Sequence, residues 1–129
     1  MAANSTPIFT ITPHIAHCLV SVANTNRDGS GALVNLVTGA AFGTRIEYIR
    51  IVAVGAVTNG VVRLFINSGS AAFLWKELLI TATTPSTTVE VFNTEYIPTS
   101  PLVIPSGYVL EVSTHNAESF NIFAHGGDY

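Results

Sequence analysis

Three residues with metal-binding or nucleophilic chemistry lie close together near the start of the chain: His14, His17 and Cys18. A zinc site needs three or four ligands that converge on one point. The neighbouring β-branched and aliphatic residues favour a strand, in which residues three apart point to opposite faces. His14 and His17 would therefore not share a metal ion, and His17 and Cys18 would not form a nucleophile pair. We expect two partly exposed histidines and a cysteine that acts as a small buried apolar side chain.

Two glycine-containing segments have the composition of ion-binding loops but lack the required partners. Residues 24–31 hold one carboxylate, Asp28, beside the cation Arg27, whereas a calcium site takes several oxygen ligands. We therefore predict a plain turn there. Gly126 and Gly127 lack the following helix and the lysine that a phosphate-binding loop uses. We predict a flexible tail at that position.

The eight acidic residues form no cluster in the sequence that would predict a general acid and base. Glu77 follows Lys76, and Glu47 lies two residues after Arg45, which predicts surface ion pairs. Such pairs contribute only about 0–1 kcal/mol each. We predict no catalytic residue, no metal ligand and no cofactor, and we do not expect an enzyme.

Short runs of Val, Ile, Thr, Phe and Tyr separated by Gly, Pro, Asn or Ser predict strands throughout the chain. Spacing of about 8–12 residues is typical of a sandwich or barrel, and we predict an all-β, jelly-roll-like antiparallel β-sandwich with eight to ten short strands. A tight turn is expected at Asn59-Gly60. The expected strands are 8–12, 14–23, 32–38, 44–54, 61–67, 71–81, 87–93, 102–104, 107–113 and 119–124.

Residues 61–66 are apolar on both faces of their expected strand, with Arg63 as the exception. Such a strand is covered on both sides, either by its own fold or by a neighbouring subunit. We expect one domain over residues 8–129, preceded by a flexible arm over residues 1–7, which are small and polar.

Ionised side chains are scarce. Only 10% of the residues are charged and 48% are hydrophobic, whereas ordinary domains carry about 25% charged residues. A small domain has much surface to cover, so we expect large areas to face other copies or another protein. The five basic residues are scattered singly, which argues against nucleic-acid binding.

Targeting signals are also missing from the sequence. We find no apolar run of about 18 residues for a membrane span, and no leader pattern in residues 1–7. A single cysteine excludes an intramolecular disulfide. We expect synthesis in a reducing cytoplasm and no membrane partner.

Several segments resemble a family of small structural proteins of tailed bacteriophages. These segments are ANTNRDGSG (23–31), GTRIEYIRI (43–51), VVRLFI (61–66), LWKE (74–77), THNAESFN (114–121) and GGD (126–128). The resemblance implies a virion component, in particular a capsid decoration (cement) protein. It further implies a β-rich homotrimer that binds the major capsid protein on the capsid surface. The first 22 residues carry none of the resemblance.

An alternative function is a receptor- or carbohydrate-binding head of a phage fibre or tail. Exposed aromatic rings could stack on sugars, and Trp75, Tyr96 and Tyr108 are the candidates. Aromatic residues are also common in sandwich cores and at buried interfaces. We therefore leave the core and interface interpretations open for Phe42, Trp75, Phe92 and Tyr96.

Overall fold

A computed structural model describes residues 9–129 of the chain, and the expected arm at 1–7 lies outside the described residues. The described part contains nine strands. They are β1 (Thr12–Val20), β2 (Val34–Thr38), β3 (Thr44–Ala53), β4 (Gly60–Asn67), β5 (Ala72–Ile80), β6 (Asn93–Tyr96), β7 (Leu102–Ile104), β8 (Val109–Thr114) and β9 (Phe120–Asp128).

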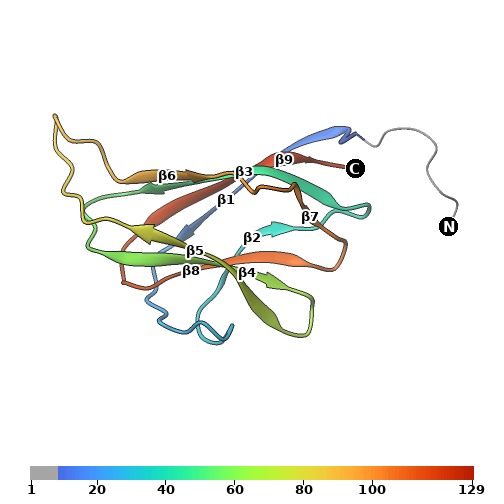
Figure 1. Ribbon diagram of the computed structural model, residues 1–129, viewed down its shortest axis with the longest axis horizontal. Helices are drawn as coiled ribbons and strands as arrows, with labels where there is room; N and C mark the ends of the chain where they lie inside the picture. The colour runs from blue at the N-terminus through green and yellow to red at the C-terminus, as the bar shows by residue number, and fades with distance from the viewer. Residues whose placement is uncertain (1–8) are drawn as a thin grey trace, which may run out of the picture.

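The strands form two antiparallel sheets that face each other across one core (Figure 1). The first, sheet A, has the order β1-β9-β3-β6, with β7 also paired to β3. The second, sheet B, has the order β2-β8-β4-β5. The chain crosses between the sheets at most of its connections, and the first strand pairs with the last. The predicted all-β antiparallel sandwich of short strands is confirmed.

Apolar side chains from alternate positions of both sheets fill the space between them. Ile49 and Ile51 of β3 face Leu64 of β4 and Val112 of β8, and all four are fully buried. The strands of sheet A show the expected alternation, since every second residue of β3 after Ile49 is buried. This core holds the two sheets in fixed positions, and the outer faces of the sheets carry the features that follow.

The predicted flexible tail at Gly126-Gly127 is wrong, because both glycines lie in β9, a central strand between β1 and β3. β3 carries a bulge at Glu47, between the pairs made by Ile46 and Tyr48. A Cβ atom on Gly126 would lie 1.7 Å from the Arg45 carbonyl oxygen. Glycine is therefore required here by the close approach of two backbones, not by flexibility.

Two strand predictions need correction. No separate strand covers 8–12 within the described residues, because β1 begins at Thr12 and continues through Pro13. Pro13 is tolerated because β1 is an edge strand, where a missing N–H need not break a ladder. Residues 87–92 form no strand, and the strand expected there begins only at Asn93. The hydrogen bonds of Ser86 to the backbone of Thr88 and Val89 form a turn there instead.

The expected turn at Asn59-Gly60 is not a hairpin turn. β3 and β4 lie in different sheets, so the residues between them cross from sheet A to sheet B. Gly60 already belongs to β4, and the Asn59 side chain accepts a hydrogen bond from Ala82 N. Ser68-Gly69-Ser70, in contrast, does turn β4 directly into its antiparallel neighbour β5.

Candidate interaction surfaces

The outer face of sheet B is covered by the protein itself. Arg63 and Phe65 point away from the core, yet both are 0% exposed. The covering loop, which we define as residues 21–33 between β1 and β2, crosses this face (Figure 1). It reaches β5, where Gly29 lies against the backbone of Ala72. Of the two explanations for an apolar strand on both sides, the structure therefore selects coverage by the chain's own fold.

Asn24 organises the covering loop. Its side-chain amide donates hydrogen bonds to the carbonyl oxygens of Ser30 and Ala32, at 3.0 and 2.9 Å. Its side-chain oxygen accepts a bond from Asn26 N at 3.0 Å. Asn24 N also donates to Thr114 O at the end of β8. Asn24 thus ties the two ends of the loop to each other through its side chain and to sheet B through its backbone.

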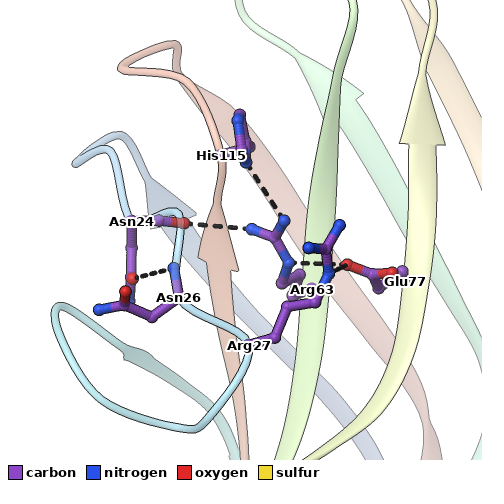
Figure 2. A network of polar contacts seen from close by, with 6 residues as sticks. All are labelled: Asn24, Asn26, Arg27, Arg63, Glu77 and His115. Atoms are coloured by element: carbon purple, nitrogen blue, oxygen red, sulfur yellow. Dashed lines mark hydrogen bonds and ion pairs between the residues drawn. The ribbon is translucent and has the colours of Figure 1, made fainter.

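A network centred on the buried Arg63 fastens the covering loop to sheet B (Figure 2). Arg63 Nε donates to Glu77 Oε2 at 2.8 Å, and Nη1 donates to Asn24 O at 3.2 Å. Nη2 lies 3.2 Å from His115 Nδ1, which must be the acceptor because a guanidinium has only donors. Three hydrogen bonds to three separate segments thus compensate the buried charge.

Glu77 lies between two guanidinium groups. Its Oε2 accepts from Arg27 Nε of the covering loop and from Arg63 Nε of β4, both at 2.8 Å. The hydrogen bonds from Arg27 and then from Arg63 lower the pKa of the Glu77 carboxyl below its ordinary value. Glu77 therefore stays ionised at neutral pH and links the loop to β4 and β5.

Sheet A has a different outer face, because no described segment crosses its β1 side. Outward-pointing Ile15 and Leu19 of β1 are 63% and 55% exposed. Next to them on β9, Phe123 lies opposite His17 and His125 lies opposite Ile15. The His125 ring also stacks on Tyr48 of β3, with a centroid separation of 4.4 Å. We call this apolar and aromatic surface the open face.

The edge of sheet A formed by β1 is also free. β1 pairs with β9 along one side and with no strand along the other, within residues 9–129. β1 contains no Lys, Arg, Asp or Glu, and neither does any other part of the first 26 residues of the chain. Sheet edges in soluble proteins are commonly protected by charges, especially lysine, or by bulges. The β1 edge has neither.

His14 and His17 point to opposite faces of β1, as predicted. His14 Nδ1 is 3.1 Å from a carboxylate oxygen of Asp128, which also accepts a 2.7 Å hydrogen bond from Thr44 Oγ1. The Thr44 bond, and after it that of His14, lower the pKa of Asp128. Because Thr44 donates to Asp128 and not to the histidine, the three groups join β1, β3 and β9 without the arrangement of a catalytic triad.

Cys18 is half-buried against the core, which agrees with its predicted role. Burial raises the pKa of its thiol to about 11. The thiolate, which is the reactive form, is therefore scarce at neutral pH. His17 points to the open face, where its ring is tilted against Phe123.

Asp28 contacts its own loop. Its carboxylate accepts bonds from Ser30 N and Ser30 Oγ, and these lower its pKa. We predicted only a plain turn for 24–31, whereas this segment forms most of the covering loop that lies across sheet B. Across residues 9–129, no group of three or more His, Cys, Asp or Glu side chains could hold a metal ion.

One predicted ion pair is confirmed and one is wrong. Arg45 Nε and Glu47 Oε1 are 2.7 Å apart. Glu77 does not pair with Lys76, because neighbouring residues of a strand point to opposite faces. Lys76 Nζ instead lies 5.0 Å from the centroid of the Tyr96 ring.

The aromatic candidates divide into core and surface residues. Trp75 of β5 and Tyr96 of β6 meet edge to face with centroids 5.6 Å apart, and Trp75 packs against the core. Phe92 also packs against the core, whereas Phe42 is 83% exposed. Tyr108 precedes β8 and takes no part in the Trp75–Tyr96 contact. The three proposed sugar-stacking rings therefore form no common platform.

Sequence reasoning missed Asn24, Glu77 and His115 as partners of Arg63. The available signal was Arg63 itself, because a cation inside an apolar strand requires acceptors from neighbouring segments. The sequence does not show which segments lie nearby. No described helix is long and apolar enough to cross a membrane.

Comparisons with known proteins place the chain in no described family. No family model matches it, and no curated protein matches it. Among solved structures it is similar to two crystal structures of a pentameric capsid protein isolated from metagenomic phage sequences. The first shares 14% identity at a TM-score of 0.37, and the alignment covers 92% of this chain and 60% of that one. The second shares 13% identity at a TM-score of 0.36, with coverages of 94% and 66%. The chain thus spans less than two thirds of either.

Proposed function

We propose that the chain is a structural protein of a phage virion, a capsid decoration protein that associates with copies of itself and binds the major capsid protein. The open face of sheet A carries this proposal. Sheet B buries its outer residues Arg63 and Phe65 under the covering loop, whereas sheet A leaves Ile15 and Leu19 exposed. Phe123 beside them is half-buried. Such uneven coverage is expected of a protein whose second face is covered by a neighbour.

The chemistry of the surface supports assembly over catalysis. The conspicuous polar cluster, around Arg63, is buried and satisfied by internal hydrogen bonds, so it has no free group to act on a substrate. Fully burying an Ile, Leu or Phe side chain contributes about 1.5–3 kcal/mol. The free energy gained by burying a few such side chains in one contact is close to the free-energy cost of association. The stability of the assembly would therefore come from many equivalent contacts over a lattice.

The phage assignment rests on the sequence resemblance of segments 23–31, 43–51, 61–66 and 114–121. These segments include the covering loop and the strand that contains Arg63, so they are the parts that build the sandwich. Jelly-roll sandwiches serve both as capsid proteins and as lectins, and the fold alone does not decide between them. Trp75 and Tyr96 are half-buried and contact each other edge to face, and this weighs against the carbohydrate-binding alternative.

We further propose synthesis in the host cytoplasm and attachment at the capsid surface. The resemblance implies a trimer, whereas the free edge of β1 favours a pair of copies, and the mass of the isolated protein in solution separates these states.

The virion role is tested on particles purified from cells that produce the encoding phage, whose protein content would be analysed by mass spectrometry. We expect a fixed ratio of this chain to the major capsid subunit, near stoichiometric. A ratio of only a few copies per particle would indicate a tail or fibre position, and absence from particles would refute the proposal.

A further inference from the structure

We propose that β1 is a pairing strand, through which two copies of this chain join edge to edge in antiparallel orientation. The two-fold axis passes through His17, and the two copies of sheet A become one continuous sheet. This inference rests on the self-association in the proposed function and names the surface that performs it.

The β1 edge has the properties of a pairing strand. It is nine residues long and pairs with β9 without a bulge over its whole length. Pro13, which cannot donate a hydrogen bond, lies near its beginning and leaves residues 14–20 uninterrupted. An edge that is long, regular and uncharged presents unsatisfied N–H and C=O groups to another strand.

The lack of charge on β1 favours a second copy as the occupant. Strands of like charge repel when they pair with themselves, because directly opposite like charges are destabilising. β1 carries no Lys, Arg, Asp or Glu, so pairing with itself meets no such penalty. It also offers no charge for a strongly acidic or basic partner to recognise. An isologous contact of this kind closes with two copies.

The order of side chains along β1 selects the register. Opposite residues in an antiparallel pair share a face, so the two-fold axis must pass through a residue and not between two. With the axis at His17, Ile15 of each copy lies opposite Leu19 of the other on the open face. On the inner face, Ala16 lies opposite Cys18. Moving the axis to Ala16 or Cys18 would instead place His17 opposite one of the exposed apolar residues, Ile15 or Leu19.

This register matches the exposure of the side chains. Ile15 and Leu19 are the two exposed apolar residues of β1, and pairing covers each with the other. Cross-strand apolar pairs of this kind stabilise sheets. The contact is small compared with standard protein interfaces, so we expect dimerisation that depends on protein concentration.

Light scattering after size exclusion, over a range of concentrations, tests the pairing. The wild-type mass should rise from 13.6 kDa toward twice that value. Leu19→Lys places a charge on the edge and should raise the dimer dissociation constant at least about tenfold. Leu79→Lys is the matched control, because Leu79 is 77% exposed on β5, the outer strand of sheet B, and should leave dimerisation unchanged. Circular dichroism confirms that each variant is folded.

Disulfide trapping tests the register. In a Cys18→Ala background, His17→Cys places two thiols directly opposite each other across the axis, at a separation that a disulfide can span. Mild oxidation should yield a covalent dimer. Ile15→Cys in the same background is the control, since its symmetry mate lies four residues away along the partner strand. Equal trapping of both variants would refute the register.

Failure of this inference is distinguishable from failure of the proposed function. A monomeric mass at all concentrations, a trimeric mass, or an oligomer that persists in Leu19→Lys would overturn the pairing. A monomeric mass would also contradict self-association outside the particle, but none of these results would remove the chain from virions. Conversely, a trapped dimer of a chain that is absent from particles would refute the virion role and leave the pairing intact.

Discussion

Arg63 Nε and Glu77 Oε2 lie 2.8 Å apart on neighbouring strands, with the arginine fully buried and the glutamate at the surface. The same carboxylate oxygen binds Arg27 of the covering loop. A single oxygen atom therefore connects a buried cation to an exposed one. This arrangement fixes the covering loop across sheet B and makes the two arginines unequal in their effect on stability.

Removing the carboxylate of Glu77 should destabilise the fold by leaving Arg63 without its ionic partner. We expect Glu77→Ala to lower the free energy of unfolding by about 1–3 kcal/mol, the cost of a buried polar group left unsatisfied. Arg27→Ala is the control. Its side chain is mostly exposed, so its loss should cost about 0–1 kcal/mol. Urea denaturation measures both, and equal losses would contradict the unequal roles.

Adding one methyl group at Gly126 should disrupt sheet A. Gly126→Ala would place a carbon atom against the Arg45 carbonyl oxygen, and overpacking of this kind costs about 1–3 kcal/mol. Gly55→Ala is the matched substitution, since nothing lies within 4 Å of the added atom. Thermal unfolding should show a clear drop in Tm for Gly126→Ala only. Similar values for the two variants would refute the close packing of β9 against β3.

Acid should weaken the protein through Glu77 and Asp128. Both carboxyls have a lowered pKa in the folded state, so they contribute stability above the ordinary carboxyl pKa of about 4. That contribution falls as the pH drops from this value toward the lowered folded pKa, because the unfolded chain takes up protons first. Unfolding measured between pH 7 and pH 3 should show this decline, and Asp128→Asn should reduce its steepness. A stability that is flat down to pH 3 would contradict it.

The Cys18 thiol should be unreactive in the folded protein. Burial raises its pKa to about 11, so little thiolate exists at pH 8. A chromogenic disulfide reagent should react slowly with the native protein and quickly in urea. Reducing agent should leave Tm unchanged. Rapid reaction without denaturant, or a lower Tm with reductant, would contradict the assignment of Cys18 as an inner-face residue.

The sequence predicts the architecture well because the sandwich depends on local patterns. Runs rich in β-branched residues identify β3, β4 and β8, and the Ser68-Gly69-Ser70 cluster identifies the hairpin between β4 and β5. The opposed directions of His14 and His17 follow from strand geometry alone. Local pattern was a poorer guide where Pro13 lies inside an edge strand and where hydroxyl side chains bend residues 87–92.

Contacts between residues that are distant in the sequence could not be predicted from these local patterns. Arg63 and Asn24 are 39 positions apart, and they meet because the loop that joins β1 of sheet A to β2 of sheet B lies across the outer face of sheet B. The sequence around Gly126 indicates a tail, and only the position of β9 between β1 and β3 shows that Gly126 lies in a central strand. The open face was expected only in general terms, from the scarcity of charge, and its position depends on which outer face the covering loop takes.

The position of β9 also determines when the protein can complete its fold. β9 is the last of the nine described strands to leave the ribosome, yet both β1 and β3 must pair with it. Thr12 meets Asp128 across nearly the whole chain, and such long-range contacts make folding slow. Until β9 has been synthesised, β1 lacks its paired neighbour and β3 is paired only with β6 and β7. We therefore expect chains stalled before residue 120 to depend on chaperones and to aggregate when released.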